Sequence, residues 1–282
     1  MPAIDDPRLC LPPGGSDQRL QVNCGVLALR KTPQADAQMV SQVLHGEVVR
    51  LHHESGEFAL VQSQTDAYTG WALMEGLSAP VLDPTHRICV PRLHSYAAPC
   101  IRAAPHFILG IGACLTATDQ RDSGYIKCRR AGWIRADLLA PMETRESDPA
   151  TVAHKFLGTP YLWGGRDCLG IDCSGLVQLA FGVCGVRAPR DSDMQYAWFG
   201  DRIENWQEPG QLQRNDLIFW RGHVGIMLDA ETLLHANAYH MAVASESLQQ
   251  AIKRIGPLYG DPIGANRVQM PKSCGSPPAW LS

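Results

Sequence analysis

The chain has 282 residues, of which 45% are hydrophobic, and this is enough apolar material for two or three packed domains. The formal net charge of −3 and the lack of a basic block argue against a nucleic-acid-binding protein, because no stretch concentrates positive charge for phosphate contacts. The sequence contains no run of eighteen apolar residues, so no membrane-spanning helix is expected. Its ten cysteines are too widely spaced to form the disulfide framework of a small disulfide-rich domain. The N-terminus has no basic, apolar leader, so we expect a cytoplasmic protein with reduced cysteines.

The first half of the sequence consists of short apolar runs separated by turn residues, a texture typical of small β-barrels. Residues 1–19 are rich in Pro, Gly and Asp and are expected to form a loosely packed arm. Residues 20–80 and 86–140 each contain three runs that we expect to form strands. The runs are EVVRLHH, EFALVQSQ and TGWALM in the first segment, and RICVPRLHSYA, GYIKCRR and AGWIRADLL in the second.

Both segments end on a similar motif, GWALMEGL at residues 70–77 and GWIRADLL at residues 132–139. This similarity, and a size of about 60 residues for each segment, predicts two related SH3-like barrels. We therefore expect three domains: an arm and first barrel in residues 1–80, a second barrel in residues 81–141, and a further domain in residues 142–282.

The second half begins with a polar linker at residues 140–149 and then changes to helices followed by strands. Asp148 and Pro149 fit the N-cap and first position of a helix, which Gly158 can end. A second helix is expected from Cys173, because apolar residues recur there at helical spacing. The strands expected after this helix are DLIFW, HVGIML, TLLHAN and MAVAS. Helices first and strands afterwards predict an α+β domain.

Cys173 is expected at the first turn of this second helix, where Asp172 or Ser174 can cap the free backbone amides. The positive end of a helix favours a thiolate over a thiol, and the same amides can bind an oxyanion. These features suit a nucleophile for acyl transfer. The alternative is that Cys173 is a small buried core residue, which is the commoner role of a free cysteine.

A thiol nucleophile needs a base, and two histidines are placed to supply it. His223 begins one expected strand, His235 lies in the next, and DAET between them is expected to be a turn. The two side chains should lie close together across a hairpin, so that one imidazole orients the other. The alternative for His235 is that it only fills a half-buried strand position. The histidines in the barrel segments are interpreted as surface or packing residues.

Five stretches resemble the NlpC/p60 family of cysteine peptidases in their order and spacing: PYLWGG, DCSGLVQLAF, NDLIFW, GHVGIML and LLHAN. The resemblance covers the last domain, residues 142–282. One departure is Asn215, where the family usually has a glycine before the aspartate. The resemblance implies an α+β papain-like catalytic domain, preceded here by two all-β SH3-like barrels, that needs no metal or cofactor.

On this resemblance Cys173 is the nucleophile, His223 is the general base and His235 orients the base. Tyr161 matches a tyrosine that helps to polarise the scissile carbonyl group. Its alternative role is that of an aromatic residue packed on the helix. The sequence contains no Cys-x-x-Cys pair, which also weakens a zinc interpretation.

Two barrels before such a core resemble a subgroup that cleaves murein peptides during recycling, between γ-D-glutamate and a diamino acid. That subgroup requires a free L-alanine at the N-terminus of the substrate, whose ammonium would pair with Asp191. The residues that the resemblance implies in substrate binding are Asp172, Ser174, Arg190, Asp191, Ser192 and Trp163, with Tyr68 and Glu47 of the first barrel closing the cleft. The alternative for Ser192 is a helix capping box with Gln195.

The sequence thus predicts a cytoplasmic cysteine endopeptidase that acts on a small murein peptide, with no nucleic-acid or membrane partner. The alternatives are an exported endopeptidase acting on intact peptidoglycan, an inactive papain-like binding module, and an acyltransferase or amidase on the same core. The sequence leaves open whether the diamino acid is lysine or meso-diaminopimelate, and it does not give the oligomeric state.

Overall fold

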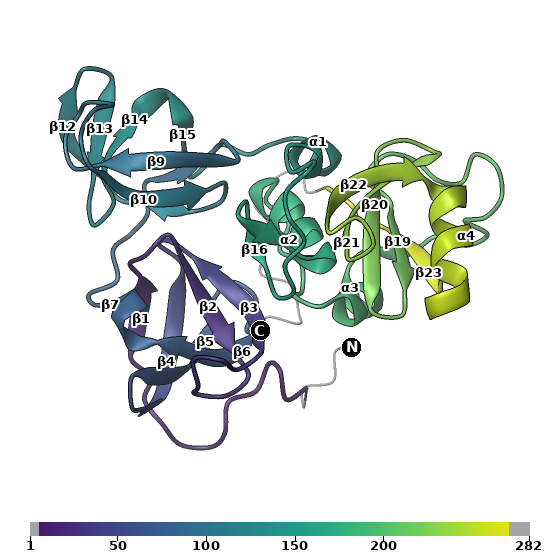
Figure 1. Ribbon diagram of the computed structural model, residues 1–282, viewed down its shortest axis with the longest axis horizontal. Helices are drawn as coiled ribbons and strands as arrows, with labels where there is room; N and C mark the ends of the chain where they lie inside the picture. The colour runs from purple at the N-terminus through teal and green to yellow at the C-terminus, as the bar shows by residue number, and fades with distance from the viewer. Residues whose placement is uncertain (1–5, 271–282) are drawn as a thin grey trace. The chain divides into compact units, whose positions relative to one another are not determined.

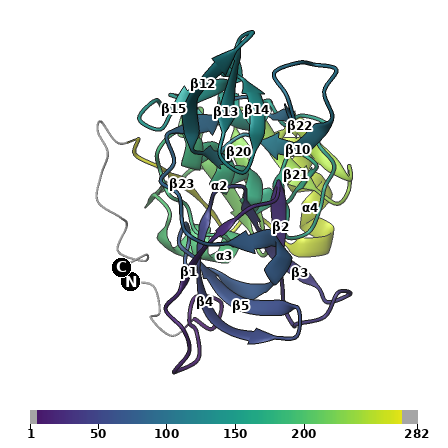
Figure 2. The ribbon, with the colours of Figure 1, turned by 90° about the vertical axis from the view of Figure 1, so that its left-hand side faces the viewer.

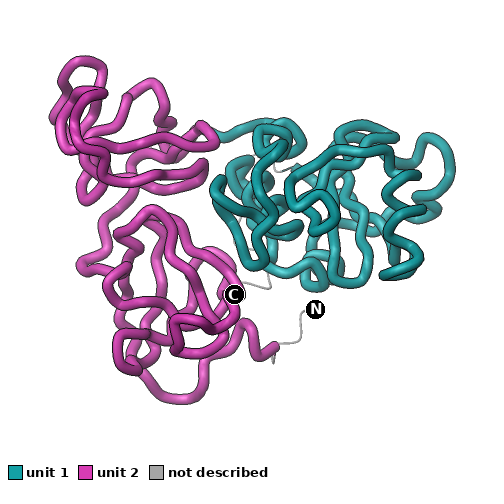
Figure 3. Tube along the Cα trace, viewed as in Figure 1, with its two compact units in different colours: residues 1–4, 145–282 teal, residues 5–144 magenta. Residues whose placement is uncertain are grey.

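The computed structural model describes residues 6–270 of the chain (Figures 1 and 2). The chain passes from one compact unit to another between Thr144 and Arg145 (Figure 3). In chain order, the first unit (residues 6–144, magenta in Figure 3) is built mainly from strands, and the second unit (residues 145–270, teal) combines helices with a six-stranded sheet. None of the helices in residues 6–270 has the length and apolar content that crossing a membrane would require.

The first part of the all-β unit is a seven-stranded antiparallel sheet in the order β3-β2-β6-β5-β4-β1-β7. Its strands are β1 (Arg19–Val22), β2 (Val26–Arg30), β3 (Met39–Leu44), β4 (Val48–Ser55), β5 (Phe58–Ser63), β6 (Thr69–Leu73) and β7 (Leu77–Ser78). The three runs expected as strands form β4, β5 and β6, which pair as neighbours. Alternate residues of these strands, such as Val49, Val61 and Ala72, point into one core.

Residues 86–141 form two further sheets, with the orders β10-β9-β14-β13-β12 and β11-β8-β15. Their strands are β8 (His86–Ile88), β9 (Arg92–Tyr96), β10 (Pro105–Gly110), β11 (Cys114–Leu115), β12 (Ala117–Asp122), β13 (Tyr125–Cys128), β14 (Gly132–Arg135) and β15 (Leu139–Pro141). β12, β13 and β14 lie side by side in both ribbon views. The run RICVPRLHSYA is not one strand but two, β8 and β9, because Pro91 has no backbone N–H to pair.

The two Gly-Trp motifs fold alike. In each, a strand leads into one turn of 3₁₀-helix, η1 (Met74–Gly76) or η2 (Ala136–Leu138), and then into a short strand. In each, the backbone N–H that follows the turn donates back to the carbonyl of its first residue. The similarity of the two motifs in sequence is therefore matched by a similarity in local structure.

The arm is bound to the first sheet and not loosely packed as expected. The backbone of Arg8 accepts a hydrogen bond from Thr69 N at 2.8 Å, and Gln18 O accepts one from Leu51 N at 2.8 Å. Residues 1–5 of the expected arm lie outside the described residues.

The second unit contains an antiparallel sheet in the order β18-β23-β19-β20-β21-β22, and a separate short pair, β16 and β17. The strands are β16 (Arg166–Asp167), β17 (Gly170–Ile171), β18 (Asp201–Arg202), β19 (Leu217–Trp220), β20 (His223–Met227), β21 (Thr232–Asn237), β22 (Ala242–Ser247) and β23 (Gly264–Arg267). The helices are α1 (Pro149–His154), α2 (Cys173–Val183), α3 (Ser192–Trp198) and α4 (Leu248–Tyr259). The four expected strands form β19 to β22.

One face of this sheet packs on α4. Trp220, Met227 and Leu233 of the sheet share a core with Leu248 and Ile255 of the helix. Because side chains alternate along a strand, the side chains that lie two or four residues from Met227 and Leu233 project from this same face. The first residue of β20 and the fourth of β21 are both histidines on that face, and this placement brings the functional side chains together.

The prediction of helices followed only by strands was wrong for α4, which comes after β22. The sequence carries a signal for this helix. Ser247 is an N-cap whose side chain accepts from Gln250 N at 3.2 Å, and apolar residues then recur at positions 248, 251, 252 and 255.

Asn215, the departure from the family pattern, lies at a turn with φ of 74°. Asparagine tolerates this left-handed conformation better than most residues with a side chain. Its side-chain oxygen accepts a hydrogen bond from Ala150 N at 2.7 Å, so the same residue fastens the first turn of α1.

Candidate active site

α2 begins at Cys173, as predicted, and Asp172 is its N-cap. The Asp172 carboxylate accepts a hydrogen bond from Gly175 N at 2.7 Å, which satisfies one of the free amides of the first turn. The same carboxylate accepts from Gly164 N at 2.9 Å. The cap therefore fixes the cysteine relative to the loop that carries Tyr161.

Arg190 holds this cap in place. Its two terminal nitrogens donate to the two Asp172 oxygens at 3.1 and 2.7 Å, and one of them also donates to Ser174 Oγ at 3.0 Å. Arg190 is 1% exposed and Asp172 is 7% exposed, so the pair is buried. The three residues form a structural network at the helix start, and their predicted contact with substrate stays a prediction.

The thiol of Cys173 is buried against the beginning of β20. Burial and then the charge of Asp172 raise the pKa of this thiol to about 12, and hydrogen bonds from the backbone of Val224 and Ser174 only partly offset the rise. The expected preference of the helix end for a thiolate is therefore outweighed by desolvation. The resting group is a thiol that must lose its proton as it reacts.

His223 and His235 meet across the β20–β21 hairpin, which confirms the expected proximity. His223 Nε2 lies 2.8 Å from His235 Nδ1. Gly225 lies on the same face of β20 as His223, and a Cβ at this position would be 2.6 Å from Leu233 Cδ1 and 3.2 Å from His235 Cβ, so the glycine leaves room for these two side chains. Burial lowers the pKa of both histidines below the usual value, so both rings are neutral at rest.

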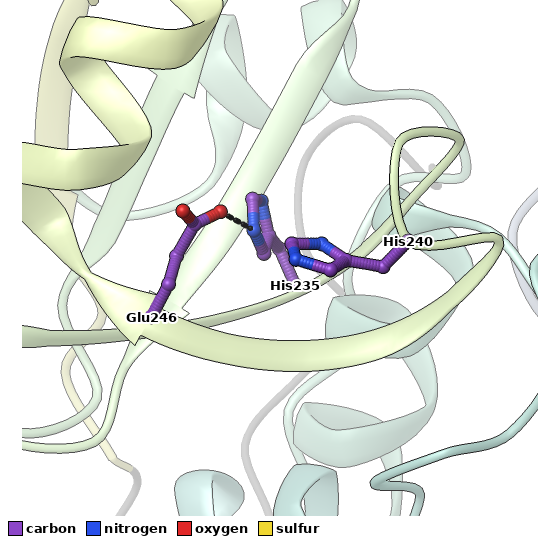
Figure 4. A group of neighbouring side chains, drawn as sticks. All are labelled: His235, His240 and Glu246. Atoms are coloured by element: carbon purple, nitrogen blue, oxygen red, sulfur yellow. Dashed lines mark hydrogen bonds and ion pairs between the residues drawn. The ribbon is translucent and has the colours of Figure 1, made fainter.

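The hydrogen-bonded chain that begins with His223 and His235, here called the relay, continues to two residues that the sequence analysis did not identify. His235 Nε2 lies 2.9 Å from Glu246 Oε1, a contact drawn as a dashed line in Figure 4. Arg254 Nη2 of α4 donates to the same oxygen. Burial alone would raise the pKa of Glu246, but hydrogen bonds from His235 and Arg254 outweigh it and lower the pKa to about 2. Glu246 is therefore a carboxylate, which can only accept hydrogen bonds.

This carboxylate fixes the proton positions along the relay. Since Glu246 only accepts, Nε2 of the neutral His235 must carry the proton, and its Nδ1 must accept. His223 Nε2 then carries the proton that it donates to His235, and the lone pair of His223 is on Nδ1. His223 Nδ1 is therefore the nitrogen of this ring that is free to accept a proton.

Tyr161 lies on the loop that precedes α2, where its backbone N donates to Met241 O at 2.9 Å. Burial, followed by the charges of Cys173 and Asp172, raises the pKa of its phenol above the usual range. The phenol is therefore a neutral O–H donor in the electrostatic range of the thiol. Its contact with the scissile carbonyl stays a prediction.

The alternative role of Ser192, a capping box with Gln195 at the start of α3, is wrong. Asp191, and not Ser192, is the N-cap, and its side chain makes no capping hydrogen bond. The Gln195 side chain is instead buried and donates to Ser174 O at 3.0 Å and Pro189 O at 2.8 Å. Gln195 thereby fastens α3 to the beginning of α2. Asp191 is half-buried, and its pairing with a substrate ammonium stays a prediction.

The remaining candidate residues are placed as follows. Trp163 is 60% exposed on the loop before α2. Glu47 and Tyr68 lie in the other compact unit, where Glu47 accepts hydrogen bonds from Leu44 N at 2.7 Å and Thr65 Oγ1 at 3.1 Å. Their predicted contribution to the substrate cleft stays a prediction.

Among residues 6–270, one group of side chains could hold a metal ion. His235, His240 and Glu246 each offer one ligand atom, and these atoms lie within 4.8 Å of one another (Figure 4). Two imidazoles and a carboxylate are a donor set that Zn²⁺ accepts.

Comparison with known proteins finds one family match within each unit. Residues 158–254 match the NlpC/P60 family profile, and residues 29–77 match the profile of the bacterial dipeptidyl-peptidase Sh3 domain. These two matches do not include residues 81–141, so the second SH3-like barrel and the predicted domain boundaries stay predictions.

Two relatives are similar over different shares of the chain. Dipeptidyl-peptidase 6 of Lysinibacillus sphaericus is 35% identical over 134 residues, which are 46% of this chain and 48% of the relative, so the chain spans about half of its length. Gamma-D-glutamyl-L-lysine dipeptidyl-peptidase of Bacillus subtilis is 27% identical over 220 residues, 70% of this chain and 71% of the relative.

A crystal structure of an NlpC/P60 family protein from Bacillus cereus is similar in fold, with a TM-score of 0.75 and 18% identity. The match covers 90% of this chain and 100% of that one. The expected fold class, an NlpC/P60 catalytic domain after an SH3-like all-β region, is confirmed.

Proposed function

We propose that the chain is a cysteine peptidase of murein peptides, because residues 158–254 match the NlpC/P60 family and residues 29–77 match the bacterial dipeptidyl-peptidase SH3 domain. The bond cleaved joins γ-D-glutamate to the diamino acid, and the substrate is a short peptide with a free N-terminal L-alanine. The names of the two relatives support this substrate class. The enzyme would serve the recycling of murein peptides in the cytoplasm.

Two observations carry the proposal: Cys173 at the start of α2 accepts a hydrogen bond from the backbone of Val224, the residue after His223, and His223, His235 and Glu246 form a hydrogen-bonded chain. A core cysteine has no need of such a chain, whereas a thiol with a raised pKa cannot attack a carbonyl without a base. The relay also argues against an inactive binding module, because each of its members, His223, His235 and Glu246, can transfer a proton or accept a hydrogen bond.

In the first half of the reaction the Cys173 sulfur attacks the γ-glutamyl carbonyl carbon while its proton passes to His223 Nδ1. The carbonyl oxygen becomes an oxyanion, which the amides of the first turn of α2 and the Tyr161 O–H can bind. His223 then gives its proton to the amine of the diamino acid as the C–N bond breaks. A thioester between Cys173 and L-Ala-γ-D-Glu remains.

In the second half a water molecule attacks this thioester and gives a proton to His223. When the C–S bond breaks, the proton returns to the Cys173 sulfur, and L-Ala-D-Glu is released. In both halves His223 is transiently an imidazolium. Its Nε2–H then donates to His235, whose own proton faces the negative Glu246, so the positive charge is stabilised along the relay.

The test is to incubate the protein with L-Ala-γ-D-Glu-meso-diaminopimelate, and in parallel with the lysine peptide, and to identify the products by mass. We expect L-Ala-D-Glu and the free diamino acid from at least one of them. Cys173→Ala should lower the rate at least about a thousandfold, while Cys100→Ala, at an exposed cysteine of the other unit, should leave it unchanged. Wild-type rates in Cys173→Ala would exclude this mechanism.

A further inference from the structure

His240 lies beside His235 and Glu246 but has no part in the proton relay (Figure 4). We propose that these three side chains form an inhibitory Zn²⁺ site, in which the metal switches off the catalytic base by reversing the proton positions of the relay. The inhibitory effect rests on the proposed function, whereas the binding of the metal does not.

The ring of His240 is held in one orientation by Asn237. Its Nδ1 lies 3.0 Å from Asn237 Oδ1, and its backbone N donates to the same oxygen at 2.9 Å. Because an amide oxygen only accepts, His240 Nδ1 carries the ring proton and Nε2 carries the lone pair. Metal-binding histidines commonly donate their other N–H to such an oxygen, which fixes the tautomer and the ring plane.

The other two ligands are also held by partners. Arg254, whose guanidinium lies 4.4 Å from the centre of the Tyr239 ring, donates to Glu246 Oε1. A carboxylate oxygen has two lone pairs, so Oε1 can bind the metal in place of the His235 proton and still accept from Arg254. His240 is exposed, whereas His235 is fully buried, so the metal can reach the group from the His240 side. Water can complete a tetrahedral set.

Zinc binding would reverse the tautomers of both catalytic histidines. When Zn²⁺ takes the lone pair at His235 Nε2, the ring proton of His235 must move to Nδ1, which then donates to His223 Nε2. The proton of His223 must in turn be on Nδ1. Both rings stay neutral and keep one proton each, but His223 Nδ1 no longer has a lone pair for the Cys173 proton. The metal charge also opposes formation of the imidazolium.

The binding test uses Cys173→Ala, which removes the thiol as a competing zinc ligand and needs no substrate. Zn²⁺ affinity is measured by competition with a chromophoric chelator. We expect the Cys173→Ala variant to bind one Zn²⁺ ion. The double variant Cys173→Ala, His240→Ala should bind Zn²⁺ with at least about tenfold lower affinity. His154→Ala, at an exposed histidine of α1, is the matched control and should leave the affinity unchanged. Equal affinity with and without His240 would overturn the site.

The activity test compares the wild type, His240→Ala and His154→Ala on the murein tripeptide. Without zinc all three should have the same kcat/KM. Added Zn²⁺ should inhibit the wild type and the His154 variant, reversibly with EDTA, while His240→Ala should need at least about ten times more zinc. Inhibition of all three at one zinc concentration would place the metal on Cys173 and overturn the switch. If the tripeptide is no substrate at all, the proposed function fails while the binding test still decides the metal site.

Discussion

At the scale of single residues, Glu246 determines which nitrogen of His223 can act as a base, although it touches neither His223 nor the thiol in the relay. Its charge is maintained by Arg254 and by the His235 proton, and both contacts use the same oxygen. A positioning residue of this kind acts through His235, so its removal should affect the rate of the chemical step and not the binding of substrate.

Glu246→Gln should lower kcat by about two orders of magnitude with little change in KM, because an amide group can donate to His235 and stabilise the wrong tautomers. The measurement is a comparison of kcat and KM on the murein tripeptide. The control is Glu231→Gln, at an exposed glutamate in the turn between β20 and β21, and it should have the kcat and KM of the wild type. A raised KM with unchanged kcat would show that Glu246 contacts substrate instead.

At the scale of elements, the beginning of α2 depends on the buried pair of Asp172 and Arg190. Arg190→Ala removes one member of this pair and leaves the carboxylate buried beside the thiol. We expect it to lower the free energy of unfolding by about 3 kcal/mol, measured in urea. Arg187→Ala, at an exposed arginine of the same loop, should change it by less than about 0.5 kcal/mol. Similar losses for both would contradict a special role for the pair.

The attachment of α1 should make the second unit sensitive to acid. Burial would raise the pKa of Asp148, but hydrogen bonds from Arg214, Thr151 and Asn215 outweigh it and lower the pKa to about 2. A carboxylate with a lowered pKa in the folded state contributes stability above its unfolded pKa of about 4 and loses it as the pH falls toward 2. The urea concentration at the unfolding midpoint of the wild type should therefore decrease as the pH is lowered from 5 to 2. Arg214→Gln should make this midpoint depend less on pH. An unchanged dependence on pH would exclude Asp148 as a contributor.

At the scale of the whole molecule, the proposed substrate has a free terminal ammonium, which we expect to pair with Asp191. The wild type should cleave the N-acetylated tripeptide about a hundredfold more slowly in kcat/KM than the free tripeptide, since acetylation removes the positive charge that the carboxylate would attract and adds bulk at the substrate terminus. Asp191→Ala should lose most of this discrimination. Equal wild-type rates on the two peptides would favour an endopeptidase of intact peptidoglycan.

Much of the site was predictable because its signals are local. The position of Cys173 at a helix start follows from the capping aspartate and the apolar spacing after it, and the meeting of His223 with His235 follows from a short hairpin. The capping box at Ser192 failed because Gln195 finds better acceptors in neighbouring segments than its own helix offers. A local motif predicts correctly only where no distant partner competes for the same side chain.

The sequence by itself predicted most of the order of elements, the family resemblance, the position of Cys173 at a helix start and the proximity of His223 and His235, since these depend on spacing along the chain. Only the tertiary structure decided that Glu246 and Arg254 complete the relay. One lies on β22 and the other on α4, and no periodicity relates them to the histidines. They meet because β22 pairs with β21 and because α4 packs on the same face of the sheet. The resting state of Cys173 was decided in the same way, because the desolvation of a thiol depends on everything packed around it and not on its neighbours in sequence.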